Sequence, residues 1–124
     1  MLQVTMTTDL DSGLCPIRSV LAKVTGKWQS LIVFSLEDGP LRFSAVKRMV
    51  GDITQRVLTE NLRSLERDGL ITRTVDPGPP VAVSYELTPL GYELVDVLKP
   101  LALWAEENFA AVSESRASHD RANS

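Results

Sequence analysis

The sequence contains only one cysteine and one histidine among its 124 residues. A single cysteine cannot form an intrachain disulfide, and no Cys/His set has the spacing of metal ligands. No apolar run reaches about 18 residues, the length that a membrane-spanning helix requires. Residues 1–13 also lack the basic and apolar regions of a signal peptide. We therefore expect a cytoplasmic protein with no metal and no membrane partner.

The motifs of enzyme active sites are missing too. The sequence has no glycine-rich phosphate loop, no pairing of a nucleophile with a histidine and no internal repeat. The lone histidine, His119, lies in a polar C-terminal stretch without a candidate partner. We therefore expect neither an enzyme nor a cofactor.

Positive charge is scarce overall, since the formal net charge is −3, but it is unevenly distributed. Residues 42–75 carry seven basic and four acidic side chains, a net charge of +3. Residues 1–41 carry three basic and four acidic side chains (net −1), and residues 76–124 carry three basic and eight acidic ones (net −5). The middle third could therefore attract a polyanion despite the acidic total.

Length and composition predict one globular domain. Hydrophobic residues make up 44% of the chain and charged residues 23%, which is typical of soluble proteins. We assign residues 14–112 to this domain, residues 1–13 to a flexible arm and residues 113–124 to a disordered polar tail. So short a chain buries a small core, and dimerisation would add to it.

The chain begins with a series of short amphipathic helices, expected over residues 17–24, 27–37 and 43–50. A tight connection then leads to Thr54, a suitable N-cap for a helix that Gly69 ends. Two helices joined by about three residues form a helix-turn-helix.

The second of these helices has two opposite faces. At about 100° per residue, Leu58, Leu62 and Leu65 fall within about 60° of one another and form a packing seam. Three arginines project from the opposite side: Arg56, Arg63 and Arg67. This arrangement suits a helix that enters the major groove of DNA. The alternative is a solvated helix whose arginines pair with nearby glutamates, Glu60 and Glu66.

Two β-strands are expected after the helix-turn-helix, over residues 70–75 and 81–87, joined by a turn rich in proline and glycine at 76–80. They would form a β-hairpin wing. Thr88-Pro89 then begins a long helix that we end at Val112, with a kink at Pro100. Its apolar residues span an arc of about 160°, more than one small core can cover. The surplus predicts a dimer interface with the first helix.

Short motifs follow one another in order between residues 15 and 105. They are Cys15-Pro16, Gly26-Lys27-Trp28, residues 39–43 (GPLRF), residues 53–59 (ITQRVLT), residues 62–70 (LRSLERDGL), residues 85–91 (YELTPLG) and Trp104. In this order and spacing they resemble the HxlR family of bacterial winged helix-turn-helix transcriptional regulators. The implied fold is mainly α with a small β-hairpin wing.

The resemblance implies a homodimer that binds an inverted repeat in double-stranded DNA and responds to a small-molecule or oxidant effector. The expected DNA contacts are Arg42, Lys47, Arg48, Thr54, Gln55, Arg56, Thr59, Arg63, Arg67 and Arg73. The expected dimer contacts, on the N- and C-terminal helices, are Ile17, Val20, Leu21, Leu94, Val97, Leu101 and Trp104. Cys15 occupies the position of a redox or electrophile sensor in several family members.

One departure from the family keeps a second function open. The family often has a basic wing tip, whereas the tip of this chain, residues 79–84, carries no lysine or arginine, and Arg73 is the only cation of the wing. Together with the acidic total, this leaves the alternative of a winged-helix adaptor that binds proteins without specific DNA binding.

Overall fold

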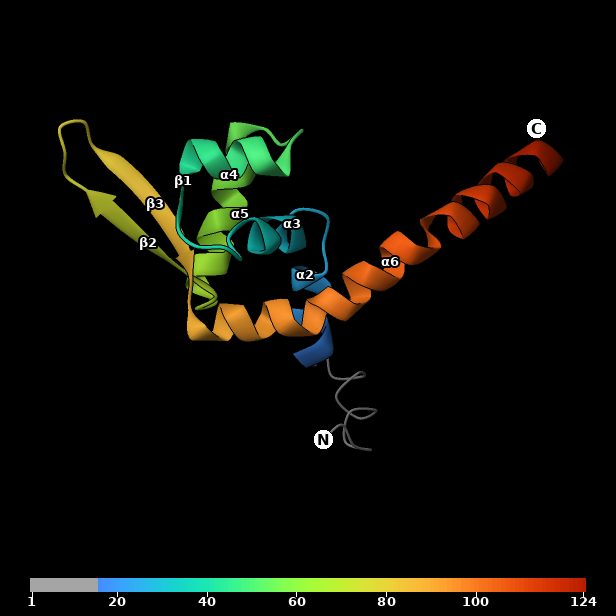
Figure 1. The fold of residues 1–124 in the computed structure, drawn as a ribbon, viewed down its shortest axis with the longest axis horizontal. Helices are drawn as coiled ribbons and strands as arrows, with labels where there is room; N and C mark the ends of the chain where they lie inside the picture. The colour runs from blue at the N-terminus through green and yellow to red at the C-terminus, as the bar shows by residue number, and fades with distance from the viewer. Residues whose placement is uncertain (1–15) are drawn as a thin grey trace.

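The computed structural model describes residues 16–124; the arm predicted at residues 1–13 and the sensor candidate Cys15 lie outside the described residues. Figure 1 shows the fold, a largely helical body with a hairpin on one side and a long C-terminal helix on the other. The elements in chain order are η1 (Ile17–Leu21), α2 (Ala22–Val24), α3 (Gln29–Ser35), β1 (Leu41–Arg42), α4 (Phe43–Val50), α5 (Gln55–Arg67), β2 (Ile71–Asp76), β3 (Ala82–Leu87) and α6 (Pro89–Ala122). The predicted winged helix-turn-helix, mainly α with a hairpin wing, is confirmed.

The helix-turn-helix consists of α4 and α5, at the positions that the sequence predicts. Thr54 is the N-cap of α5, and its hydroxyl oxygen accepts a hydrogen bond from the Val57 amide at 3.2 Å. Gly69 follows the helix with a φ of 78°, a left-handed conformation that favours glycine. Both ends of α5 are therefore set by local sequence.

The first two helices are less regular than predicted. The helix expected over residues 17–24 is a π-helical segment, η1, followed by the single turn α2. The helix expected over residues 27–37 is shorter, since α3 covers Gln29–Ser35. The first difference is in the type of helix, whereas the second concerns helix ends, whose bounds are the least certain part of a prediction. Trp28, just before α3, is half-buried and packs against the core.

The core forms where α3, α5 and the sheet meet. The leucine seam of α5 (Leu58, Leu62, Leu65) is fully buried, as predicted, and packs in one cluster with Ile32 and Val33 of α3. Burial of a large aliphatic side chain contributes about 1.5–3 kcal/mol relative to leaving it exposed. This burial holds α5 against the body by its leucine face.

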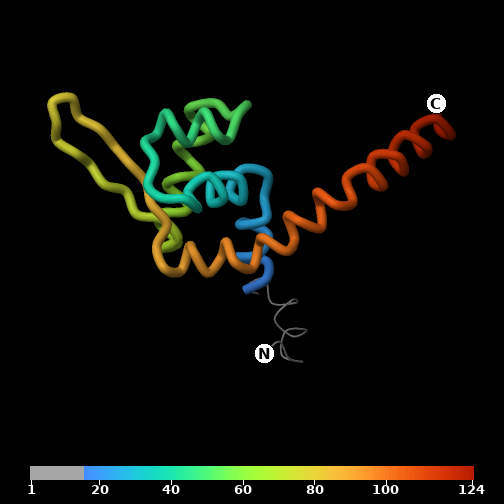
Figure 2. The backbone as a smooth tube through the Cα atoms, in the orientation of Figure 1, coloured from blue at the N-terminus to red at the C-terminus, as the bar shows by residue number. Residues whose placement is uncertain are grey.

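The sheet has three antiparallel strands in the order β1-β3-β2, so the structure adds one strand to the predicted hairpin. Leu41 of β1 pairs with Tyr85 of β3, and Arg42 pairs with Ser84. A two-residue strand shows no alternation of polar and apolar residues, which is why the sequence did not predict β1. Figure 2 shows the hairpin of β2 and β3 extending away from the body.

The C-terminal helix is longer than predicted. α6 continues to Ala122, so residues 113–122 are helical and the predicted disordered tail is wrong for them. No glycine or proline follows Pro100, and lengthening an existing helix costs far less than starting one. α6 changes direction along its length (Figures 1 and 2), and Pro100 lies inside it, which agrees with the predicted kink.

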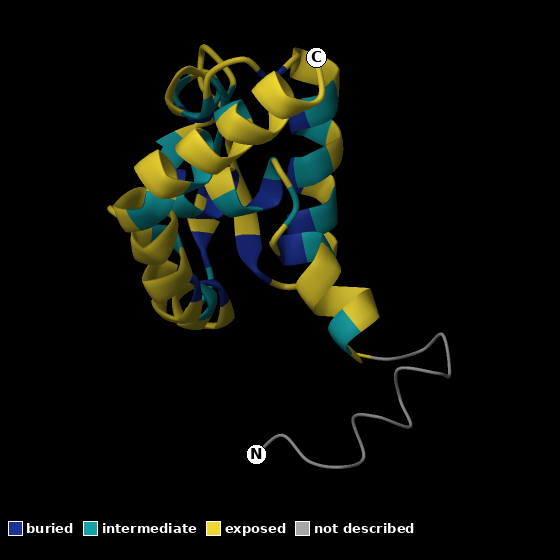
Figure 3. Cartoon of the chain, turned by 90° about the vertical axis from the view of Figure 1, so that its right-hand side faces the viewer, coloured by how far each residue is buried: buried dark blue, intermediate teal, exposed yellow. Residues whose placement is uncertain are grey.

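The N-terminal half of α6 is attached to the body, whereas its C-terminal part extends away from it (Figure 1). Val95 and Leu98 are buried. Lys99 forms an ion pair with Glu37, which lies two residues beyond the end of α3. The hydrogen bond to Glu37 and its negative charge raise the pKa of Lys99. Beyond this point the helix is mostly exposed (Figure 3). A long single helix with so little burial in its own chain is a surface available for a partner.

Candidate nucleic-acid interface

The surface of α5 opposite its leucine seam is exposed and basic. Gln55, Arg56, Arg63 and Arg67 are all exposed, while the leucines of the seam are buried. The structure therefore confirms the two opposite faces that the sequence predicts. Because the leucines are anchored in the core, the arginine side chains extend outward from a fixed backbone.

Arg56 forms an ion pair along the helix. Its Nε donates to Glu60 Oε2 at 3.4 Å, while the Arg56 side chain stays 86% exposed. Exposed pairs of this kind contribute about 0.3–0.5 kcal/mol, so a phosphate or a base could displace Glu60 at little cost. Among residues 16–124, neither Arg63 nor Arg67 has a carboxylate partner. The glutamate-paired alternative thus accounts for one of the three arginines.

The polar residues at the start of α5 also serve the helix itself. The hydroxyl of Thr54 accepts the capping hydrogen bond and keeps its own proton for a further acceptor. The hydroxyl of Thr59 donates to the Gln55 carbonyl at 2.8 Å, and Thr59 is half-buried. The Gln55 side chain is exposed at the first turn, the part of a recognition helix that reaches base edges first.

Two further cations lie close to the beginning of α5. Lys47 and Arg48 occupy the last turn of α4, and residues 51–53 alone separate α4 from Thr54. Arg48 is exposed and Lys47 is half-buried. We name the set formed by Lys47, Arg48 and the exposed α5 residues (Gln55, Arg56, Arg63, Arg67) the basic face.

Arg42 and Arg73 do not share one surface. In the sheet, Arg73 pairs with Tyr85, which in turn pairs with Leu41, whereas Arg42 pairs with Ser84. Directly paired residues place their side chains on the same face of a sheet, and neighbours along a strand alternate. Arg42 and Arg73 therefore project from opposite faces, and only one of them can lie on the same side as a given DNA backbone.

The wing tip is apolar and exposed. Val75 and Val81, at the ends of the hairpin, are both exposed large hydrophobic residues. Asp76 Oδ1 accepts a hydrogen bond from the Gly78 amide at 3.1 Å and closes the turn. A tip without cations can contact a groove wall through apolar atoms but gives no charge-assisted bond to phosphate.

The residues predicted for dimer contacts form exposed apolar surface in this single chain. Val20, Leu21, Val97, Leu101 and Trp104 are exposed, and Ile17 and Leu94 are half-buried. The exposed fraction of the residue reaches 68% for Val97 and 57% for Trp104. Phe109 and Leu103 of α6 are exposed as well, although Leu103 lies about 160° around the helix from Leu101 and therefore on another side. The number of large apolar side chains exposed on η1 and α6 favours an interaction site there.

Two polar contacts connect α5 and its C-cap residue to the N-terminal helices, and the sequence predicted neither. Lys23 Nζ donates to Asp68 Oδ2 at 2.8 Å, and Gln29 Nε2 donates to Ser64 Oγ at 3.2 Å. The partners are 45 and 35 residues apart, so no local pattern indicates them. Within the described part of the chain, no group of three or more His, Cys, Asp and Glu side chains could hold a metal ion. No helix of that part is long and apolar enough to cross a membrane.

Known proteins with the same arrangement are transcriptional regulators. The family model described as HxlR-like helix-turn-helix matches residues 23–113. The HTH-type transcriptional regulator YtfH of Escherichia coli is 38% identical over 117 residues, which is 90% of this chain and 93% of YtfH. The solved structure of the transcriptional regulator ytfH from Salmonella typhimurium has a TM-score of 0.79 and 40% identity, and the match covers 87% of this chain and 96% of that one. The redox regulator HypR in its oxidised form has a TM-score of 0.70 and 37% identity, and the match covers 76% of this chain and 97% of HypR.

Proposed function

The chain belongs to the HxlR-like helix-turn-helix family of transcriptional regulators, and from this premise we propose that it binds a specific DNA sequence as a homodimer. The observation that carries the proposal is the basic face, whose arginines are exposed on a helix that its leucines hold in the core. In this arrangement α5 enters the major groove, and the cations of α4 contact the phosphates beside it. The site of action is then the cytoplasm.

The first test is a footprint on the DNA upstream of the protein's own gene and its neighbour, followed by affinity measurements on the protected site. Arg56→Ala should cost about 1–3 kcal/mol on that site if Arg56 reads a base, and less on random DNA. Arg116→Ala, a cation on the exposed C-terminal part of α6, is the matched control and should leave the affinity unchanged. Equal losses on both DNAs would make Arg56 a phosphate contact. Unchanged binding after replacement of both Arg56 and Arg63 would reject α5 as the recognition helix.

The proposed dimer gives the DNA site its symmetry. A two-fold dimer reads an inverted repeat whose half-sites lie about one helical turn, 10–10.5 bp, or a multiple of it apart. The apolar surface of η1 and α6 supports this assembly, since a monomer would leave it in water. The footprint also tests this point, because a single asymmetric half-site would contradict the two-fold arrangement.

Cys15 is proposed as the oxidant-responsive residue, on the strength of the likeness to the redox regulator HypR. It lies outside the described residues, and it is the only cysteine of the chain. Two-electron oxidation could join the Cys15 thiols of two subunits in a disulfide, form a mixed disulfide with a small thiol or give a sulfenic acid. The test compares operator affinity before and after diamide or hydrogen peroxide for the native protein and Cys15→Ser. A treatment that leaves the native affinity unchanged, or shifts both proteins alike, makes Cys15 structural.

The apolar wing tip supports the second candidate, a protein-binding adaptor. Salt separates the two functions, because a protein that neutralises phosphates releases counterions and loses affinity steeply as salt rises. We expect a steep, linear fall of log K for DNA with log salt concentration, and a slope smaller by about one after Arg63→Ala. DNA binding that is weak and equal on all sequences, alongside a salt-insensitive protein complex, would favour the adaptor.

A further inference from the structure

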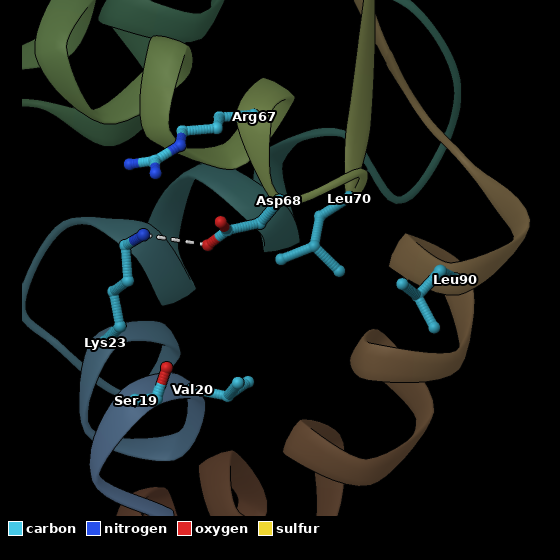
Figure 4. Close-up of a pocket in the computed structure, with 7 residues that line it drawn as sticks. All are labelled: Ser19, Val20, Lys23, Arg67, Asp68, Leu70 and Leu90. Carbon is cyan, nitrogen blue, oxygen red and sulfur yellow. Dashed lines mark hydrogen bonds and ion pairs between the residues drawn. The ribbon is translucent and has the colours of Figure 1, made fainter. Parts of the chain in front are cut away.

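A cavity of about 410 Å³ lies between the N-terminal helical segment, the C-terminal end of α5 and the start of α6. Figure 4 shows the residues that line it. Val20, Leu70 and Leu90 form its apolar wall, and each comes from a different element or connection. The volume falls in the range of small-molecule sites, which combine a largely apolar lining with a few convergent polar groups.

The polar side of the cavity is net positive. Ser19, Lys23, Arg67 and Asp68 line it, so its charged groups are two cations and one carboxylate. Lys23 and Asp68 pair at 2.8 Å, and each side chain stays about one-third exposed. Arg67 has no carboxylate partner among residues 16–124, so its charge is available to a ligand. A cavity with this lining favours an anion over a cation.

We propose that this cavity binds a small organic anion, a carboxylate on an apolar body, and that its occupancy changes the affinity of the protein for DNA. The carboxylate lies between Lys23 and Arg67, and the apolar body lies on the wall of Val20, Leu70 and Leu90. The regulatory half of this inference rests on the proposed function, whereas the binding half does not.

A neighbouring cavity of about 270 Å³ fixes the direction of the ligand. It shares the apolar wall of the first cavity and continues along Leu94 and Val97 of α6. Its one charged lining residue is Glu93, which repels a carboxylate. The charged end of the ligand is therefore held at the Lys23 side, and a longer apolar body extends toward Val97.

The cavity lies at the joint that positions the recognition helix. Asp68 is the C-cap residue of α5, and Lys23 holds it to α2. The Leu70 carbonyl accepts a hydrogen bond from the Thr88 amide at 3.1 Å, and the Thr88 hydroxyl donates to the Gly69 carbonyl at 2.6 Å. A ligand carboxylate competes with Asp68 for Lys23 and so weakens the contact that holds the end of α5 to α2.

Only one lining residue of the main cavity, Val20, belongs to the predicted dimer surface. The ligand therefore lies between the DNA-reading part and the edge of the dimer surface, where a change in the joint alters the spacing of the two recognition helices. Arg67 lines the cavity and belongs to the basic face, so a ligand that pairs with Arg67 also withdraws this cation from DNA, in addition to its effect through the joint.

The experiment uses 4-phenylbutyrate as the probe and its neutral amide, 4-phenylbutyramide, as the matched compound. Calorimetric titration of the full-length protein measures phenylbutyrate binding in the absence of DNA. Changes in the NMR chemical shifts of the Leu70 and Leu90 methyl groups show whether the compound binds at the cavity. Lys23→Met should weaken phenylbutyrate binding about tenfold, since it removes the cation but keeps the stem, and Leu90→Trp should fill the apolar side and block binding. Arg116→Met is the matched control with unchanged binding, and circular dichroism confirms that each variant is folded. Saturating phenylbutyrate should change operator affinity at least about fivefold, and Lys23→Met should lose this response.

Each contrary result rejects one part of the proposal or the proposed function. No binding of phenylbutyrate to the native protein, or equal binding of the amide, overturns the anion site. Binding that survives both Lys23→Met and Leu90→Trp overturns its location. Binding at the cavity with unchanged operator affinity overturns the regulatory role. A protein that binds the probe here but binds no specific DNA leaves the site standing and rejects the proposed function instead.

Discussion

At the scale of single residues, the acidic neighbour of Arg56 determines how this arginine is presented. Glu60 lies one turn further along α5 and accepts a hydrogen bond from Arg56 Nε. Without DNA, the pair keeps the guanidinium along the helix surface. In a complex, Glu60 would lie close to the phosphates and oppose them. In the proposed complex we therefore expect Glu60 to lower the affinity for any DNA, while this exposed pair holds Arg56 only weakly.

Glu60→Gln should accordingly increase DNA affinity about two- to fivefold, because it frees Arg56 and removes one negative charge near the backbone. The gain should be similar on specific and random DNA and should shrink at high salt. Glu114→Gln is the matched control, since Glu114 also pairs with an arginine, Arg121, at 3.5 Å but lies on the C-terminal part of α6. Fluorescence anisotropy at two salt concentrations measures the effect. Equal behaviour of the two variants would show that Glu60 lies away from the DNA.

At the scale of elements, the start of α6 is locked against the end of α5. Thr88 is the N-cap of α6, and its hydroxyl accepts from the Gly91 amide at 3.1 Å while donating to the Gly69 carbonyl. Gly91 allows this close approach, because a Cβ at this position would lie 2.2 Å from the Leu70 carbonyl oxygen. The start of α6 thus packs against the backbone of the residues that follow α5, and backbone atoms cannot move aside as a flexible side chain could.

Gly91→Ala should therefore destabilise the protein by about 1–3 kcal/mol, as overpacking does, although alanine is the better helix former. Chemical denaturation measures the loss. Ser115→Ala, on the exposed part of the same helix, should change the stability by less than about 0.5 kcal/mol. A Gly91→Ala protein as stable as the native one would mean that the joint between α5 and α6 is loose.

At the scale of the whole molecule, two surfaces of different chemistry lie on different elements. The basic face belongs to α4 and α5, whereas the exposed apolar surface follows η1 and α6. A net charge of −3 is therefore compatible with DNA binding, because acidic residues gather outside the segment that bears the basic face. α6 contains both a buried part, which packs against the core, and an exposed part, which would contact the second copy in the proposed dimer.

Adjacent turns of α6 should consequently respond differently to the same substitution. Leu98 is only 6% exposed, whereas Leu101 is 54% exposed. Leu98→Asp buries a charge in the core and should unfold the chain, since an unpaired buried charge costs several kcal/mol. Leu101→Asp should leave the monomer folded, dissociate the dimer and abolish operator binding. Sedimentation equilibrium and circular dichroism distinguish the two results, and a native protein that is monomeric at micromolar concentration would reject the interface.

Much of the fold and of the basic face was predictable because it depends on local sequence. The spacing of Leu58, Leu62 and Leu65 determines which side of α5 is buried, and hence which side carries its arginines. Thr54 and Gly69 mark the ends of that helix through hydrogen bonds and a left-handed φ that involve near neighbours only. Proline and glycine at residues 77–80 determine the turn of the wing in the same way.

Tertiary structure alone decided the features that depend on distant partners. Strand β1 exists because Leu41 and Arg42 meet β3, and the pairing register places Arg42 and Arg73 on opposite faces. The cavity beside Lys23 and Asp68 needs three segments brought together from the beginning, middle and end of the chain. Periodicity and capping report contacts within a few residues, whereas strand register, ion pairs and cavities arise from packing between residues that the sequence keeps far apart.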